Sequence, residues 1–453
     1  MKWLSSLVVI LVVSSAATVS ARRPNVLFLL ADDQRADTVS ALGNPYIQTP
    51  YLDTLVGRGF AFTRAYDMGS INPAVCVPSR AMLLTGRNLF TATSSAKSVE
   101  IPAVNRMWPE VFRAAGYKTI GIGKWHNDQA SFNRAFSGGG PVFFGGTADP
   151  EQMQVYDYRT KGDYTEDYLH PVGKHASEAF ADAAIAQLRA NRLNPFVMFV
   201  AFTAPHDPRR APADYMQRYS PDSLPLPANF MPAHPFDNGA MNVRDELLLP
   251  IPRTPEAVRG ELAAYYAMIT HMDAQIGRIL KVLSSSGLAN NTIIVFASDN
   301  GLALGSHGLL GKQNLYEHSV RVPLIFCGPG IPGGGSSGLC QLHDIFPTLC
   351  ALTGLPLPAS VQGKSLMPLM RGQEQIRDSI FCAYGNVQRM VSDERWKLII
   401  YPQSHRAQLF DLSIDADELN DLSGDWSFES QIRRMSAKLV SHEWSMHDPM
   451  RLK

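Results

Sequence analysis

The sequence lacks an excess of charge of either sign. Its 453 residues include 41 Lys and Arg against 41 Asp and Glu, which gives a formal net charge of zero at pH 7. Proteins that coat nucleic acid or lie on an anionic membrane attract these partners through a basic excess. We therefore expect no nucleic-acid partner. Because 45% of the residues are hydrophobic and 18% are charged, the chain can bury a large core, and disorder is excluded as its main state.

Cysteines and long apolar runs are also scarce. Five cysteines are too few for a disulfide scaffold, and their odd number leaves at least one unpaired. Whether the others form disulfides stays open. The cysteines are Cys76, Cys327, Cys340, Cys350 and Cys382.

The apolar run at residues 4–13 is shorter than the roughly 20 residues that span a bilayer. It follows Lys2 and precedes small residues that end at Ala21, an order typical of a secretory signal peptide. We therefore expect residues 1–21 to be a signal peptide. The mature chain is then exported, to the periplasm or the medium, and has no membrane span.

Short apolar segments bounded by turn residues alternate with longer amphipathic stretches. This alternation predicts an α/β fold with a large, mostly parallel central sheet flanked by helices. The predicted strands are residues 25–31, 118–123, 196–202, 292–297 and 322–327. The predicted helices are residues 49–57, 78–86, 106–115, 175–191 and 254–287.

The pattern changes after Gly354. Residues 381–385, 388–391, 396–401 and 408–412 read as strands with short turns, and residues 427–442 read as a helix. We therefore predict a large α/β domain at residues 22–355 and a small C-terminal antiparallel sheet with a helix at residues 356–453.

Two stretches have little periodicity and are rich in glycine, proline and aromatic residues. They cover residues 127–171 and 205–252. Long irregular connections in an α/β protein often carry function. We expect both stretches to form the rim of a pocket.

Polar residues follow four of the predicted strands. The first strand is followed by Asp32 and Asp33, the second by Lys124 and His126, the third by His206, and the fourth by Asp299 and Asn300. In open α/β sheets, ligands bind outside the carboxyl ends of the strands. We therefore expect these side chains to lie together.

The chemistry of this set indicates a metal-assisted hydrolase for an anionic substrate. The Asp and Asn side chains offer only oxygen ligands, which suit calcium or, as second choice, magnesium, and argue against zinc. Either acidic pair taken alone could equally form an ordinary turn. Lys124, His126 and His206 could hold an anion and move its proton. Cys76 lies just before a predicted helix and could supply the nucleophile.

The segment Cys76-Val77-Pro78-Ser79-Arg80 resembles the signature Cys-x-Pro-x-Arg of the sulfatase family, within the alkaline phosphatase superfamily. In that family the cysteine is oxidised after translation to formylglycine. The resemblance extends over nearly the whole mature chain. Its segments are, in order, NVLFLLADDQ, CVPSRAMLLTGR, GIGKWH, APH, SDNG, GKQNLYEHSVRVPLIF and QLFDL.

The resemblance implies a role for each matching residue. Arg80 would stabilise the formylglycine, Lys124 and Lys312 would bind the sulfate, His126 would be the base that breaks down the hydrate, and His206 would bind sulfate or assist the leaving group. The implied calcium ligands are Asp32, Asp33, Asp299, Asn300 and the formylglycine at Cys76.

The resemblance also implies the reaction and the partners. The hydrated aldehyde has two hydroxyls, of which one attacks sulfur and the other then expels sulfate. Maturation requires a formylglycine-generating enzyme. Secreted bacterial sulfatases of this kind mostly act on sulfated carbohydrates, so we expect a sulfated sugar as substrate. The sequence leaves open which sugar and which sulfate position are used.

Two alternatives remain. Relatives in the same superfamily that hydrolyse phosphodiesters or phosphonate monoesters also use formylglycine. If Cys76 stays a thiol, the chain could instead bind a sulfated ligand without turnover.

Overall fold

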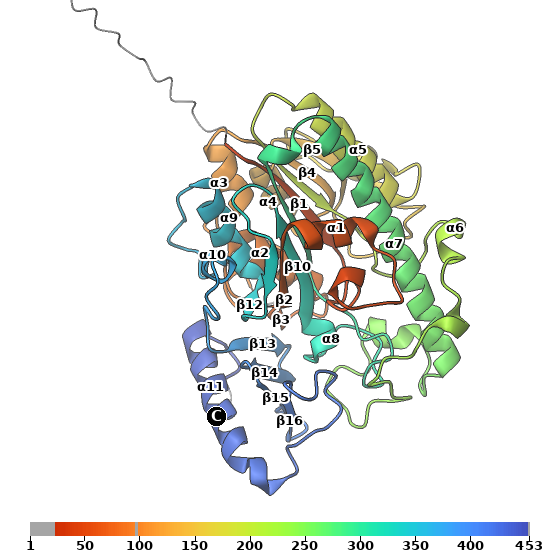
Figure 1. The fold of residues 1–453 in the computed structure, drawn as a ribbon, viewed down its shortest axis with the longest axis vertical. Helices are drawn as coiled ribbons and strands as arrows, with labels where there is room; N and C mark the ends of the chain where they lie inside the picture. The colour runs from red at the N-terminus through yellow and green to blue at the C-terminus, as the bar shows by residue number, and fades with distance from the viewer. Residues whose placement is uncertain (1–22, 96–97, 452–453) are drawn as a thin grey trace, which may run out of the picture.

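The computed structural model describes residues 23–95 and 98–451. The predicted signal peptide, residues 1–21, lies outside the described residues, so it stays a prediction. Figure 1 shows a large sheet between layers of helices, with a smaller sheet and a long helix at the opposite end from the first described residues. None of the helices within the two described ranges is long and apolar enough to cross a membrane.

The large sheet contains all five strands predicted for this part of the chain, within one residue at each end. In spatial order it runs β11-β2-β10-β9-β1-β8-β4-β5, with β12 paired to β2. Strands β9, β1, β8 and β4 are parallel, whereas β10 runs antiparallel to β9. The sheet is therefore mostly parallel, as predicted. The five strands are β1 (Asn25–Ala31), β4 (Lys118–Lys124), β8 (Phe196–Ala201), β9 (Thr292–Ser298) and β10 (Arg321–Cys327).

Helices cover both faces of this sheet. On one face, α2 (Cys76–Thr85), α3 (Trp108–Ala114), α4 (Gln129–Ala135) and α9 (Ile345–Thr353) pack against alternate residues of β1 such as Phe28. On the other face, a second core joins the remaining β1 residues to three further helices. These are α1 (Pro50–Arg58), α5 (Ala176–Ala190) and α7 (Pro255–Ser285). Because both faces are covered, β1 is buried along its whole length.

Four strands of the large sheet were missing from the sequence prediction. In β5 (Gly138–Phe143) three glycines conceal the strand pattern, and Gly139 is needed because the backbones of β5 and β4 approach closely there. A Cβ at Gly139 would lie 1.9 Å from the carbonyl oxygen of Gly121. The others are β2 (Phe60–Tyr66), β11 (Gly334–Ser336) and β12 (Cys340–Gln341).

The C-terminal sheet has four antiparallel strands, as predicted, and a fifth strand from elsewhere. The short strand β3 (Gly69–Ser70) pairs parallel with the first of the four, so the sheet includes a segment of the N-terminal part. Helix α11 (Glu429–Met446) packs against the sheet. The boundary at residue 355 stays a prediction. The four strands are β13 (Ile380–Tyr384), β14 (Gln388–Ser392), β15 (Trp396–Tyr401) and β16 (Arg406–Asp411).

Short elements occupy the connections. The stretch predicted to be irregular at residues 127–171 contains α4, β5 and a two-stranded ribbon, whereas residues 205–252 contain one short α-helix and 3-10 turns. The remaining short elements are α6 (Ala213–Met216), α8 (Glu317–Val320), α10 (Met367–Met370), β6 (Gln154–Val155) and β7 (His170–Pro171).

All five cysteines are buried and unpaired. No disulfide therefore stabilises the described chain.

Candidate active site

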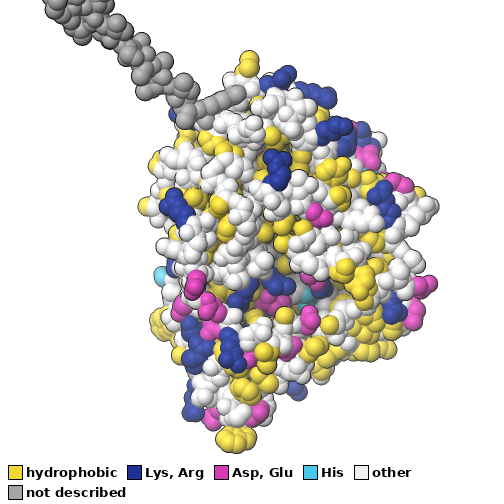
Figure 2. All heavy atoms as spheres, viewed as in Figure 1, with side chains coloured by type: hydrophobic (Ala, Val, Ile, Leu, Met, Phe, Trp, Pro, Cys, Tyr) yellow, Lys and Arg dark blue, Asp and Glu magenta, His cyan; other side chains and the backbone are white. Residues whose placement is uncertain are grey.

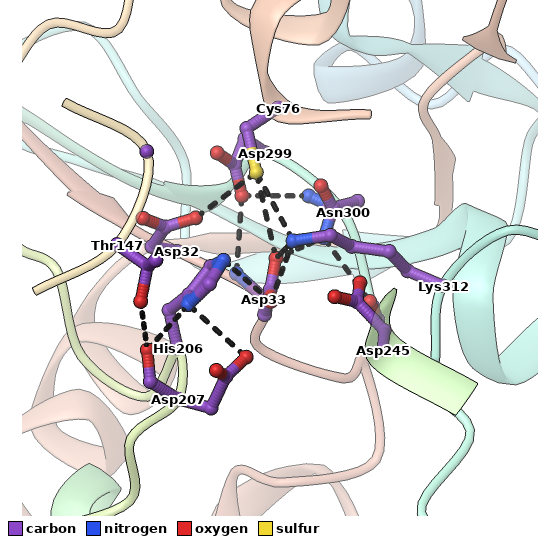
Figure 3. A network of polar contacts seen from close by, with 12 residues as sticks. Asp32, Asp33, Cys76, Thr147, His206, Asp207, Asp245, Asp299, Asn300 and Lys312 are labelled. Atoms are coloured by element: carbon purple, nitrogen blue, oxygen red, sulfur yellow. Dashed lines mark hydrogen bonds and ion pairs between the residues drawn. The ribbon is translucent and has the colours of Figure 1, made fainter. Parts of the chain in front are cut away.

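The carboxyl ends of four neighbouring strands converge on one cluster of polar side chains. Asp32 and Asp33 follow β1, Lys124 ends β4, His206 follows β8, and Asp299 and Asn300 follow β9. Figure 3 shows most of these side chains pointing toward one another around Cys76. The backbone of Asp33 is left-handed, with φ of 69°, which non-glycine residues adopt mainly where the surroundings hold them.

Cys76 is the first residue of α2 and is 1% exposed. Its thiol donates to Oδ1 of Asp32 at 3.3 Å, and Nζ of Lys312 lies 3.2 Å from Sγ. Burial raises the pKa of the Cys76 thiol well above its usual value, and the negative charge of Asp32 raises it further. The thiol is therefore protonated at neutral pH.

Three cations match three carboxylates in the cluster. The Nε of Arg80 donates to Asp299 at 2.9 Å, Lys124 forms an ion pair with Asp32, and Lys312 forms one with Asp33. Each of these six side chains is at most 4% exposed. Burial of unpaired charges would be costly, so the pairing is what allows this cluster to exist inside the protein.

The carboxylates of the cluster differ in acidity. Burial opposes ionisation of Asp32, but the charges of Lys124 and Arg80 outweigh it and hold the pKa of Asp32 well below its usual range. Burial, together with repulsion from Asp32, raises the pKa of Asp299 to about 7. Such crowding of carboxylates would be relieved by a bound cation.

The donor set fits a hard metal ion. Ligand atoms of Asp32, Asp33, Cys76 and His206 all lie within 4.8 Å of one another. The side-chain oxygen of Asn300 is buried without a hydrogen-bond partner, and its amide donates to Asp33 at 2.6 Å. Carboxylate and amide oxygens are the preferred ligands of calcium and magnesium.

The positions of two residues differ from those expected for the predicted set of metal ligands. His206 joins the group that could share an ion, with Nε2 3.7 Å from Oδ2 of Asp33. Asp299 lies in the cluster, but its Oδ1 accepts from the backbone amides of Asp33 and Asn300 and its Oδ2 accepts from Arg80. Its carboxylate would have to share these hydrogen bonds with a metal.

Both histidines that were predicted to be catalytic have a lowered pKa. His206 lies 2.8 Å, through Nδ1, from the carbonyl oxygen of Asp207, which leaves Nε2 facing the cluster. Burial, and then the charge of Lys312, lowers the pKa of His206. Burial, and then the charge of Lys124, holds the pKa of His126 well below its usual value. His126 is therefore neutral at physiological pH and able to accept a proton.

A cavity of about 260 Å³ opens onto the cluster. Cys76, His126, His206 and Lys312 are among the residues that line it. Figure 2 shows acidic, basic and histidine side chains gathered in a hollow near the middle of the face, above the C-terminal sheet. Both irregular stretches contribute to its wall, as predicted, through Gly146 and Thr147 from the first and residues 243–245 from the second.

Sequence reasoning missed four polar residues of the cavity wall: Thr147, Arg244, Asp245 and Gln313. Arg244 and Asp245 begin a short 3-10 helix in a stretch without periodicity. Gln313 follows Lys312 directly, and only this adjacency could have drawn attention to it.

The protein-family model described as sulfatase matches residues 24–355 of this chain. A second model, described as N-sulphoglucosamine sulphohydrolase, C-terminal, matches residues 305–444. The two matches together cover most of the described chain.

Curated relatives align over most of the chain. An arylsulfatase of Clostridium perfringens is 30% identical over 92% of this chain and 94% of its own. An ulvan-active sulfatase of Formosa agariphila is 29% identical over 92% of this chain and 80% of its own. An N-acetylglucosamine-6-O-sulfatase of Bacteroides thetaiotaomicron is 26% identical over 94% of this chain and 88% of its own.

Solved structures share the fold. A structure described as a putative sulfatase of Bacteroides fragilis has a TM-score of 0.78 at 23% identity and covers 94% of this chain and 97% of its own. A phosphonate monoester hydrolase of Agrobacterium radiobacter has a TM-score of 0.74 at 23% identity, over 94% of this chain and 96% of its own.

Proposed function

The chain belongs to the sulfatase family and hydrolyses sulfate esters, and from this premise we propose that its substrate is a sulfated carbohydrate. We further propose that a formylglycine made from Cys76 and a bound calcium ion carry the reaction. One observation supports this most directly: Cys76 lines a cavity, and its thiol lies among the carboxylates and lysines of one buried cluster.

The environment of Cys76 supports a modified side chain. Burial and the charge of Asp32 keep the thiol protonated, and a protonated thiol is a poor nucleophile. An aldehyde at this position supplies, once hydrated, one hydroxyl to attack sulfur and another to release the sulfate. Oxidation of Cys76 would be the work of a formylglycine-generating enzyme.

Asp32, Asp33, Asp299, Asn300 and residue 76 would hold the metal. Calcium is our first choice and magnesium the second, because the protein ligands are oxygens. The ion would supply Lewis-acid activation and positive charge beside the ester. The unpartnered oxygen of Asn300 and the raised pKa of Asp299 both support a cation at this point.

The chain's own residues would hold the sulfate and move protons. Lys124, Lys312 and Arg80 lie around Cys76 and provide positive charge for the ester's sulfate group. His206 presents Nε2 to the cluster and would donate a proton to the leaving sugar oxygen. His126 is neutral and lines the same cavity, so it would serve as the base that restores the resting site.

The competing activity is hydrolysis of phosphonate monoesters or phosphodiesters, because the fold is shared with a phosphonate monoester hydrolase. A panel of sulfated mono-, oligo- and polysaccharides, aryl sulfates, phosphodiesters and phosphonate monoesters tests the proposal. We expect sulfate release from at least one sulfated glycan. Turnover of phosphonates or aryl sulfates without any glycan would contradict the substrate class, and no turnover by formylglycine-containing protein would favour a binding protein.

A further inference from the structure

The mouth of the cavity is built around one arginine held between two carboxylates. Arg244 forms an ion pair with Asp207 through both terminal nitrogens, and one of them also donates to Asp245 at 2.8 Å. The Arg244 side chain is 50% exposed, whereas those of Asp207 and Asp245 are 9% exposed. The carboxylates therefore lie beneath the guanidinium group, which faces the opening.

Both carboxylates are fixed from behind. The Oδ2 of Asp245 accepts from the amide of Gln313 at 2.8 Å. Asp207 is held at its backbone, where its carbonyl oxygen accepts from the hydroxyl of Thr147 at 2.6 Å, and its Oδ1 lies 3.3 Å from Nδ1 of His206 (Figure 3). Each carboxylate therefore has a partner besides Arg244, which favours one orientation of the mouth before a ligand enters.

Charge is distributed unevenly along the cavity. In the buried cluster around Cys76, three cations match three carboxylates, and a bound metal would add positive charge. At the mouth, Arg244 and Asp245 line the cavity, and Asp207 pairs with Arg244 from outside the lining. The two carboxylates outnumber the one guanidinium group and leave this group with one excess negative charge. Two further cations act on these carboxylates, and both are already paired: Lys312, which acts on Asp245, pairs with Asp33, and Arg209, which acts on Asp207, pairs with Glu261.

We infer that the mouth selects a sugar ring whose groups next to the scissile sulfate are uncharged hydroxyls or a cationic amine, and that it rejects a second sulfate or a carboxylate there. This inference rests on the proposed function. Hydroxyls can donate to carboxylates and accept from the guanidinium group at once. A second anion in the same place would lie beside Asp245, and the excess negative charge of the group formed by Arg244, Asp245 and Asp207 would oppose it.

The size and lining of the cavity support this assignment. Its volume of about 260 Å³ lies below the roughly 300–1,000 Å³ of pockets for larger ligands. A ring whose sulfate lies beside Cys76 therefore has its neighbouring substituents in the mouth. Pro73, Ala74 and Val243 form an apolar part of the wall, against which the C–H face of a sugar can pack.

The test compares two substrates on one enzyme preparation: a sugar monosulfate with free neighbouring hydroxyls, and the same sugar with a second sulfate or a carboxylate beside the ester. We expect kcat/KM to favour the monosulfate by at least about tenfold. Asp245→Asn, which keeps the shape of the side chain, should reduce that preference by about tenfold. A ratio measured on one preparation does not depend on how much of it is folded or carries formylglycine.

Two further variants sharpen the result. Asp149→Asn is the matched control, because Asp149 pairs with Arg210 at 2.9 Å and does not line this cavity, so it should leave the ratio unchanged. Arg244→Gln removes the cation of the mouth and should raise KM for the monosulfate and increase the preference against the second anion.

Three outcomes would overturn the inference. A preference for the doubly anionic sugar, or an unchanged ratio in Asp245→Asn, would exclude selection by this mouth while leaving the proposed function intact. If neither sugar were hydrolysed but aryl sulfates or phosphonates were, the inference and the proposed substrate class would both be wrong.

Discussion

The ammonium group of Lys312 lies against both carboxylate oxygens of Asp33, with its Nζ 2.6 Å from Oδ1 and 2.7 Å from Oδ2. The two residues are far apart in the sequence, yet each is buried beside the other. A metal ion at Asp33 would compete with this lysine for the carboxylate. The displaced ammonium group would then be available to an anionic substrate, so metal binding and substrate binding should be coupled.

Removal of the metal should abolish turnover. We expect activity to be lost on treatment with a chelator and restored by calcium, with magnesium less effective, because the proposed ligands are oxygens. Calcium should also raise the melting temperature, because an ion that binds only the folded state stabilises it.

Asp299→Ala should reduce kcat at least about a hundredfold, because it removes both a proposed ligand and the partner of Arg80. Circular dichroism should confirm that the variant stays folded. Elemental analysis that found stoichiometric zinc in active enzyme would contradict the calcium assignment.

Residue 76 should be formylglycine in active protein. Mass spectrometry of the tryptic peptide at residues 65–80 should find an aldehyde in place of the thiol, and Cys76→Ala should be inactive. The specific activity of different preparations should rise in proportion to the converted fraction. An active preparation that contained only the thiol form would disprove this mechanism.

His206→Ala should affect substrates according to their leaving groups. A sugar alkoxide needs a proton to leave, and general acid catalysis is typically worth about 10²–10⁴-fold, so the loss should reach this size for a sugar sulfate. The loss should be below about tenfold for nitrophenyl sulfate, whose phenolate leaves readily. Equal losses for both substrates would indicate that His206 binds sulfate or supports the structure instead.

Buried His307 should make the fold sensitive to acid. Burial lowers its pKa to about 4, against about 6.5 in an unfolded chain. Between these values only the unfolded state takes up the proton, so this contribution to stability is fully present above pH 6.5 and is lost as the pH falls toward 4. The loss is about 1.4 kcal/mol per pH unit.

The measurement is urea unfolding of the wild type and of His307→Asn at pH 7.5, 6 and 5. Asparagine tolerates the left-handed backbone at this position, where φ is 53°. Buried Asp273, whose pKa burial raises to about 7, acts in the opposite sense, so the informative quantity is the difference between the two proteins. The wild type should lose more stability than the variant on acidification, and parallel curves would argue against the role of His307.

The sequence predicted those elements whose pattern of apolar and polar residues lies within one short segment of the chain. Strands β1, β8 and β9 are continuous apolar runs, and the polar residues at their ends follow directly, so topology alone brought Asp32, His206 and Asp299 together. Strand β5 could not be predicted, because glycine has no strand propensity of its own and Gly139 is required by a contact with β4 that the sequence does not show.

The side-chain contacts at the mouth of the cavity could not be predicted from the sequence either. The orientation of Asp245 depends on Gln313, 68 positions away, and that of Arg244 depends on Asp207. Neither contact leaves a periodic pattern. Only the general expectation that the stretch at residues 205–252 borders the pocket could be drawn, and the cavity wall agrees with it.

The pairing of β3 with β13 has a consequence for the order of events during synthesis. Gly69 and Ser70 precede Cys76 by a few residues and are covered by Ala383 and Tyr384, which emerge from the ribosome much later. Synthesis of the roughly 300 intervening residues takes on the order of 15–60 s. Because Cys76 is 1% exposed once the fold is complete, an enzyme that modifies it must act within this interval or on a chain held unfolded. Slower translation downstream of residue 76 should therefore increase the fraction of chains in which Cys76 is modified.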